Sequence, residues 1–213
     1  MAFIVSDEIE HYAAAHTSPP DELLARLADE TRATLESPQM LTGQIEGRFL
    51  ELLVFAMGAR RVLEIGTYSG YGALSMAAGL PSDGHIDTCE LEERHAEVAR
   101  RYIAQSPYAD RIAVHVGPAL ETVARLEGPF DLVFVDADKT GYRDYYEAVL
   151  PKLADRGLIA FDNTLQNGRV IEDPDGNSST RAIVELNELL AADPRVTCVL
   201  LTVRDGVTLA RRN

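Results

Sequence analysis

The chain has 213 residues, and its 34 acidic side chains against 20 lysines and arginines give a formal net charge of −14 at pH 7. Its length and its composition, 46% hydrophobic and 25% charged, are those of one globular domain spanning residues 1–213. The acidic charge argues against nucleic acid as the main partner, and the lack of any long apolar run argues against a membrane span.

Helices are predicted in the first 58 residues, ahead of the repeating part of the chain. A double proline precedes residues 21–37, where leucines recur at helical spacing, and Pro38 ends that segment. A further helix is predicted over residues 42–57. The opening apolar run, residues 1–5, is too short for a secretory signal. The apolar stripe on the first of these helices is expected to be core or the interface of a homodimer; it consists of Leu23, Leu27 and Leu35.

Residues 59–213 alternate short apolar runs with segments long enough for helices. The runs are Val62–Ile65, Ile86–Cys89, Ile112–Val116, Leu132–Val135 and Leu158–Phe161. Such alternation specifies a parallel sheet with helices on both faces.

The end of the chain breaks this alternation. Asp205-Gly206 lies between two strand-like runs, residues 196–203 and 207–211, and predicts a hairpin whose last strand is antiparallel to the sheet. The predicted fold is therefore an α/β, Rossmann-like sheet of seven strands, mostly parallel, with extra N-terminal helices. The longest loop is expected at residues 164–178, which are rich in Asn, Gly, Asp and Pro.

The two cysteines indicate the compartment. Cys89 and Cys198 both lie in apolar, strand-like runs, where buried thiols are expected. Buried free thiols are typical of a reducing cytosol, so we expect a cytoplasmic protein.

A glycine-rich turn follows the first strand, in the order Glu64-Ile-Gly66-Thr-Tyr-Ser-Gly70-Tyr-Gly72. In doubly wound sheets this turn binds nucleotides, but the spacing lacks the glycine that admits a pyrophosphate. Glu64, two residues before the first glycine, favours a positively charged cofactor without phosphates, as S-adenosylmethionine is. Glu90, at the end of the next strand, is placed to accept hydrogen bonds from ribose hydroxyls. The alternative is a structural turn with a solvated Glu90.

Oxygen-bearing side chains follow the fourth and fifth strands. Asp136-Ala-Asp138-Lys139 ends one strand and Asp162-Asn163 ends the other. Because adjacent parallel strands deliver their carboxyl ends to one crevice, Asp136, Asp162 and Asn163 are expected to converge. Three oxygen ligands select a hard cation, Mg²⁺, Mn²⁺ or Ca²⁺, over zinc. The alternative is that these residues cap the following helices.

With these motifs the sequence resembles the cation-dependent O-methyltransferases typified by plant caffeoyl-CoA 3-O-methyltransferase and its bacterial relatives. The shared stretches are residues 40–50, 64–71, 117–120, 134–139, 162–168 and 205–208. The resemblance implies a cofactor site for S-adenosylmethionine, with Glu90 at the ribose. That site would be lined by Met40, Thr42, Glu64, Gly66, Thr67, Ala119, Asp136 and Asp138. Gly72 belongs to the same site but stands where many members have a serine near the cofactor's carboxylate.

The resemblance also implies roles at the reaction centre. Asp136, Asp162 and Asn163 match the family's metal ligands, with Asp136 and Lys139 taking part in catalysis. Lys139 matches a lysine near the reacting hydroxyl, and Asn167 a residue near the acceptor. Gln166 stands where plant members have a tryptophan, and residues 1–37 do not match the plant substrate-binding part, so recognition of coenzyme A does not carry over.

The expected reaction is cation-dependent transfer of a methyl group to a hydroxyl of a catechol-type molecule. A cation bound to the phenolic oxygen lowers its pKa, and Lys139 stabilises the phenolate or accepts its proton. Alternatives are a tRNA hydroxyuridine as acceptor, or a non-catalytic nucleotide-binding module. Homodimers are usual in the family, and no membrane partner is expected.

Overall fold

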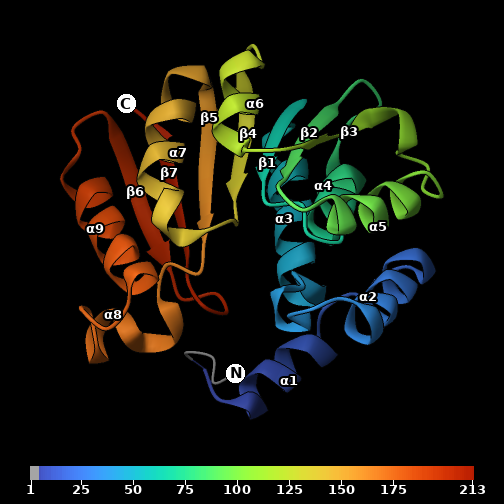
Figure 1. Cartoon of the computed structure of the whole chain (residues 1–213), viewed down its shortest axis with the longest axis horizontal. Helices are drawn as coiled ribbons and strands as arrows, with labels where there is room; N and C mark the ends of the chain where they lie inside the picture. Colours follow the sequence, from blue (N-terminus) through green and yellow to red (C-terminus); the bar gives the residue numbers. More distant parts are fainter. Residues whose placement is uncertain (1–4) are drawn as a thin grey trace.

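A seven-stranded sheet forms the centre of the structure, a computed structural model in which residues 5–213 are described (Figure 1). The strands are β1 (Arg61–Ile65), β2 (His85–Glu90), β3 (Ile112–Val116), β4 (Phe130–Val135), β5 (Leu153–Asp162), β6 (Val196–Leu201) and β7 (Val207–Arg212). Their order is β3-β2-β1-β4-β5-β7-β6. β7 pairs antiparallel with both β5 and β6, whereas β1 to β5 are parallel. The predicted sheet and hairpin are thereby confirmed.

Helices flank this sheet and precede it. They are α1 (Asp7–Ala15), α2 (Glu22–Thr34), α3 (Gly43–Met57), α4 (Tyr71–Gly79), α5 (Glu93–Ile103), α6 (Ala119–Arg125), α7 (Tyr142–Val149), α8 (Arg169–Glu172) and α9 (Ser178–Ala192). Short 3-10 turns are η1 (Pro38–Met40), η2 (Ala109–Arg111), η3 (Lys139–Gly141), η4 (Leu150–Lys152) and η5 (Gln166–Gly168). Within residues 5–213 no helix has the length and apolar character needed to span a bilayer. Of the opening run, residues 1–4 lie outside the described residues.

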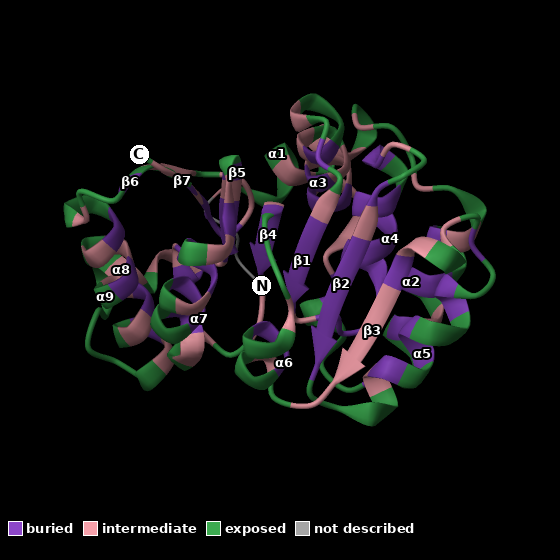
Figure 2. Cartoon of the chain, turned by 90° about the horizontal axis from the view of Figure 1, so that it is seen from above, coloured by how far each residue is buried: buried purple, intermediate pink, exposed green. Residues whose placement is uncertain are grey.

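Two apolar cores lie on opposite faces of the sheet, because successive side chains of a strand point to opposite sides. Val62 and Phe134 pack with α2, α3, α4 and α5, whereas Leu63 and Val135 pack with α6, α7 and α9. The central strands are buried and the edge strand β3 is half-buried (Figure 2). The strands therefore have long apolar runs, as doubly covered strands do.

The leucine stripe of the N-terminal region belongs to this core. Leu27 is fully buried, Leu35 is buried, and Leu23 packs against the same cluster. The Asp21 side chain caps α2 by accepting from the Leu24 amide at 2.8 Å. The helix was predicted well, but the expectation that this stripe supplies a subunit interface is wrong, because its own chain covers it.

The loop expected at residues 164–178 is partly helical. It contains η5 and the one-turn helix α8, and Asn177 caps α9 by accepting from the Thr180 amide at 2.9 Å. The polar, glycine-rich composition of this segment predicted a loop. Its helical turns depend on hydrogen bonds with the β6–β7 turn, which the composition of the segment does not indicate. The amides of Thr164 and Leu165 donate to Gly206 O at 3.0 Å and to Asp205 O at 2.9 Å.

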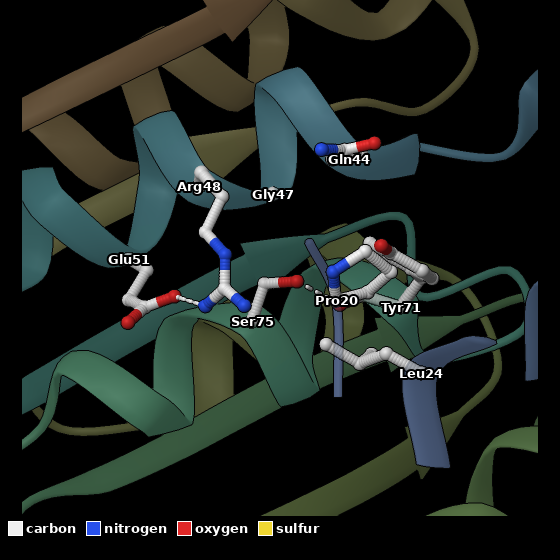
Figure 3. Close-up of a pocket in the computed structure, with 8 residues that line it drawn as sticks. All are labelled: Pro20, Leu24, Gln44, Gly47, Arg48, Glu51, Tyr71 and Ser75. Carbon is white, nitrogen blue, oxygen red and sulfur yellow. Dashed lines mark hydrogen bonds and ion pairs between the residues drawn. The ribbon is translucent and has the colours of Figure 1, made fainter. Parts of the chain in front are cut away.

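The close contact between α3 and α4 fixes the N-terminal helices on the sheet (Figure 3). Gly47 faces Tyr71 and Ser75 so closely that a Cβ there would lie 2.7 Å from Ser75 Oγ and 2.9 Å from Tyr71 Cε1. On the outer side of α3, Gln44 donates to the carbonyls of Ala14 and Thr17 at 3.1 and 2.9 Å. α3 thereby holds the α1–α2 connection in place.

Replacing Gly47 tests this contact. We expect Gly47→Val to lower the free energy of unfolding by about 1–3 kcal/mol, because the added side chain forces α3 and α4 apart. The control is Ala56→Val, which adds a valine at an exposed position of the same helix and should change stability by less than about 0.5 kcal/mol. Urea denaturation measures both; equal stability of the two variants would contradict the close-contact argument.

Candidate active site

A cleft of about 860 Å³ opens at the carboxyl ends of the central strands. Most of the residues predicted for the site line it, namely Met40, Thr42, Gly66, Glu90, Ala119, Asp136, Asp138, Lys139, Asp162, Asn163 and Asn167. Glu64, Thr67 and Gly72 are buried and do not line the cleft. The structure thus brings predicted site residues that are far apart in the sequence into one cleft. The other three are buried and do not line it.

The position of Gly66, directly after β1, has no room for a side chain, because the backbone that follows β4 lies against it. Its φ is +107°, and a Cβ would lie 1.9 Å from the carbonyl oxygen of Asp136. The Asp136 amide donates to Ile65 O at 2.8 Å, and the Gly66 amide donates to Cys89 O at 3.0 Å. This glycine therefore joins three strand ends at the floor of the cleft.

Glu64 lies under the glycine turn in a fully buried position. It accepts a short hydrogen bond from the Thr88 hydroxyl, which also contacts Thr67 Oγ1 at 2.5 Å. Burial raises the pKa of Glu64 to about 8. A Cβ at Gly72 would lie 2.3 Å from Glu64 Oε1, so Glu64 fills the space that a serine side chain would need.

Glu90 is oriented toward the cleft by backbone donors. Its Oε2 accepts from the Tyr68 amide at 2.6 Å and its Oε1 from the Glu92 amide at 2.9 Å. His95 Nδ1 lies 3.4 Å from the same Oε1. Two amide bonds leave lone pairs on both oxygens, so the carboxylate is still able to accept two hydroxyls of a ligand.

Asp138 is held by a buried tyrosine of α7. The Tyr145 hydroxyl donates to Asp138 Oδ1 at 2.6 Å, and Thr140 Oγ1 donates to Oδ2 at 3.2 Å. A Cβ at Gly141 would lie 2.9 Å from Asp138 Oδ2 and 2.8 Å from the Tyr145 ring, so the glycine lets these two side chains meet.

Lys139 is clamped between an acid and a tyrosine. Its Nζ lies 2.9 Å from Asp136 Oδ1 and donates to the Tyr142 hydroxyl at 2.6 Å. Burial lowers the pKa of Lys139, but the charges of Asp136 and Asp162 and the Tyr142 hydroxyl outweigh it and raise that pKa above its ordinary value. Lys139 is therefore paired at once with a carboxylate and a hydroxyl.

A charge cluster surrounds the end of β5; it consists of Glu46, Asp136, Asp162, Lys139 and Arg204. Glu46 and Asp162 are both buried and both line the cleft, and Arg204 Nη1 lies 2.7 Å from Glu46 Oε2. Burial and the neighbouring Asp136 raise the pKa of Asp162, and burial and Asp162 raise that of Glu46. Three acids, two of them buried, are thus balanced by the positive charges of Lys139 and Arg204.

The predicted ligand set fits a hard divalent cation on its donor chemistry. Asp136, Asp162 and Asn163 offer oxygens only, and a divalent charge would offset the excess of carboxylates. Glu46 Oε1 is buried and has no hydrogen-bond donor among the described residues. Within residues 5–213 no three His, Cys, Asp or Glu side chains are arranged to hold a metal ion, so two carboxylates and the Asn163 amide would be the protein's contribution.

The wall beside this cluster is formed by the segment after β5. The Asn167 amide donates to Asp205 Oδ1, and Arg169 Nη2 donates to Gln166 Oε1 at 3.1 Å. Asn167 Oδ1 is buried and has no partner within the described part of the chain. This wall is polar and lies next to Lys139 and Asn163 in the cleft.

Sequence reasoning missed several residues of the site. They are Glu46, Tyr142, Tyr145, Arg204 and Asp205. Four of them hydrogen-bond to predicted site residues, and Glu46 pairs with Arg204. Glu46 and Asp205 lie inside stretches that carry the family resemblance, which was the available signal. No sequence signal marked Tyr142 and Tyr145 as site residues, because aromatic residues on a helix usually indicate packing.

Known proteins resemble this chain in sequence and in structure. The O-methyltransferase family profile matches residues 14–213. Caffeoyl-CoA O-methyltransferase 1 of Eucalyptus globulus is 38% identical over 184 residues, covering 81% of this chain and 75% of its own.

Solved structures extend the match to nearly the whole chain. An O-methyltransferase from Bacillus cereus in complex with SAH superposes with a TM-score of 0.88 at 32% identity, covering 97% of both chains. The O-methyltransferase TomG from Streptomyces achromogenes in complex with SAM has a TM-score of 0.88 at 31% identity, covering 96% of both.

The fold and cleft thus define a methyltransferase of the Rossmann-like class. The chain belongs to the O-methyltransferase family and is of the caffeoyl-CoA O-methyltransferase type. The resemblance stated from the motifs is confirmed, as is the enzyme class of S-adenosylmethionine-dependent O-methyltransferases.

The buried Glu64 predicts a pH dependence of stability. Its pKa rises from 4.5 to about 8 on folding, so between these values the native state holds a proton that the unfolded state has released. The free energy of unfolding therefore falls as pH rises from about 4.5 to about 8, by up to about 1.4 kcal/mol per pH unit from this group. We expect Glu64→Gln to remove that part of the slope.

Urea denaturation at four pH values between 5 and 8 measures how the free energy of unfolding changes with pH. Glu97→Gln, at an exposed position of α5, is the matched control and should keep the wild-type slope. A Glu64→Gln variant with the wild-type slope would show that Glu64 is ionised in the native protein.

Proposed function

We propose that this enzyme transfers the methyl group of S-adenosylmethionine to one hydroxyl of a catechol-type molecule and that a divalent cation assists the reaction. The observation that carries the proposal is that Glu90 and Asp138 line the same cleft as a second group, Asp136, Asp162, Asn163 and Lys139. The first group suits a nucleoside with a positive charge, and the second suits a chelated diol.

The donor side is argued from carboxylates held in place. Glu90 is fixed by two backbone amides and accepts the ribose hydroxyls, while Asp138, fixed by Tyr145, offers an acceptor beside Ala119. Two solved structures of the same fold hold SAM and SAH, which supports this donor.

The acceptor side is argued from charge. When bound, S-adenosylmethionine supplies an electrophilic methyl group, and a divalent cation supplies a positive charge that favours ionisation of a phenol, whose ordinary pKa is about 10. Asp136, Asp162 and Asn163 would hold that cation. A diol with adjacent oxygens suits such a site because both oxygens are oriented at once.

Lys139 acts by its charge. Its contacts with Asp136 and Tyr142 hold the amine in the cleft, where its positive charge would stabilise the negative oxygen of the acceptor. Asn167 and Gln166 border the acceptor from the loop after β5.

A hydroxylated nucleoside in RNA is the alternative acceptor. Several carboxylates line the cleft, including Glu90, Glu92, Asp138 and Asp205, and the chain has a net charge of −14. Both disfavour a polyanion, because phosphate binding needs clustered cations. A small phenolic acceptor is the better fit.

Tyr145 provides a test of the donor side. Tyr145→Phe removes the hydroxyl that fixes Asp138, and we expect the dissociation constant for S-adenosylmethionine to rise several-fold, on the order of 1 kcal/mol. The control is Tyr146→Phe, whose hydroxyl donates to Asp193 Oδ2 at 2.8 Å away from the cleft. Titration calorimetry measures both; equal affinities in the two variants would contradict the role given to Asp138.

The cation and the diol are tested together by initial rates. We expect EDTA to abolish activity, Mg²⁺ to restore it, and a monohydroxy analogue to react far more slowly than its catechol. Asp162→Asn should lower the rate at least about 100-fold, because a charged ligand is replaced by a neutral one. Asp155→Asn, at an exposed position of the same strand, is the matched control. Full activity in EDTA, or equal rates on both acceptors, would refute the cation proposal.

We further propose a homodimer, on a different surface from the leucine stripe. Leu52 and Phe55 are 63% and 72% exposed and lie three residues apart on α3, so they form one apolar patch. Light scattering of the wild type should give twice 23.3 kDa, and Leu52→Ser with Phe55→Ser should give the monomer. A monomeric wild type at micromolar concentration would refute it.

A further inference from the structure

Arg169 is a cation of the cleft for which the proposed reaction has no use so far. Among the described residues, three lysine and arginine side chains line the cleft, Lys139, Arg169 and Arg204. Lys139 pairs with Asp136 at 2.9 Å, and Arg204 Nη1 lies 2.7 Å from Glu46 Oε2. Arg169, in contrast, forms no ion pair with a carboxylate in the described part of the chain. Its surroundings therefore indicate what its charge is for.

A buried amide side chain orients Arg169. Arg169 Nη2 donates to Gln166 Oε1 at 3.1 Å, and Gln166 Nε2 in turn donates to the carbonyl oxygen of Asn163 at 3.1 Å. Because Gln166 is only 5% exposed and is hydrogen-bonded at both ends of its amide, it has little freedom to rotate. The guanidinium of Arg169 is thus held two hydrogen bonds away from Asn163, one of the proposed cation ligands. An arginine that only keeps the surface polar needs no such bridge.

The remaining donors of Arg169 suit a carboxylate. A guanidinium has five N–H donors in a planar fork, and Gln166 accepts from one of its nitrogens only. Asp205, an acid of the same wall, accepts from the Asn167 amide and forms no ion pair with Arg169 within the described residues. Arg169 is exposed where it borders the cleft, so a ligand can reach it. A ligand carboxylate matches such a fork, because arginine binds it with two parallel, charge-assisted hydrogen bonds.

We propose that the acceptor is a catechol that also carries a carboxylate, and that Arg169 binds this carboxylate and so determines acceptor specificity. The inference rests on the proposed methylation of a catechol-type molecule and names that acceptor more closely. A neutral ester or amide of the same acid lacks the charge that pairs with Arg169. Because Glu90 and Asp205 also line the cleft and repel an anion, a preference for the acid depends on Arg169.

The experiment compares kcat/KM of the full-length enzyme for two acceptors, a (dihydroxyphenyl)acetate with adjacent hydroxyls and the amide of the same acid, with S-adenosylmethionine and Mg²⁺ present. The methylene group separates the carboxyl from the ring, so the two acceptors differ in charge and hardly in the acidity of their hydroxyls. The wild type should prefer the acid about 10-fold, as one charge-assisted contact allows. Arg169→Gln should remove this preference, chiefly by raising KM for the acid. Arg169→Lys keeps the charge without the fork and should give an intermediate preference.

Arg181→Gln is the matched control. Arg181 is also exposed and also donates to a neutral oxygen, the carbonyl of Asp175 at 2.8 Å, but it does not line the cleft. This variant should keep the preference of the wild type for the acid. The preference is a ratio measured on one enzyme preparation, so a partly unfolded sample does not change it.

The inference is overturned if the wild type methylates the acid and the amide equally well, or if Arg169→Gln keeps the wild-type preference. In both cases the proposed methylation of a catechol stands, because product is formed. A wild-type enzyme that methylates neither acceptor would instead overturn the proposed function, and the role of Arg169 with it.

Discussion

The crowding of three carboxylates, two of them buried, beside neighbouring strand ends is the constraint on which the rest of the site depends. Glu46, Asp136 and Asp162 come from α3, β4 and β5, and their mutual repulsion is compensated by Lys139 and Arg204. In a buried environment such repulsion is strong, so each acid needs a fixed partner. The fold provides these partners from elements that would otherwise have no reason to meet, including the β6–β7 turn and the N-terminal helix α3.

Parallel topology creates this constraint. In a parallel sheet the ends of β1, β2, β4 and β5 point to the same edge, so the polar residues after each strand converge whatever their distance in the sequence. The two glycines that matter most here, Gly66 and Gly141, act by admitting close contacts, the first between backbones and the second between Tyr145 and Asp138. The antiparallel β7 then brings Arg204 and Asp205 beside the same edge.

This explains which parts were predictable from the sequence. Strand ends and the hairpin are local patterns, so Asp136, Asp162 and the last strand were placed correctly. The pairing of Glu46 with Arg204 spans 158 positions, and no local pattern contains it. The leucine stripe of α2 shows the same limit, because helical periodicity identifies an apolar face but not the surface that covers it.

Strained backbone positions are concentrated around the cleft. Among the described residues six non-glycine positions have positive φ, and all of them except Ser37 line the cleft: Tyr68, Asn163, Gln166, Asn167 and Arg204. Each such position costs on the order of 1–3 kcal/mol and persists only where its surroundings fix it. Here the surroundings are specific, since Glu90 holds the Tyr68 amide, Asp205 holds the Asn167 amide, and Glu46 holds Arg204. The acids of the cleft therefore have two functions at once, because they fix the strained loops and also present the charge that the site offers to its ligands.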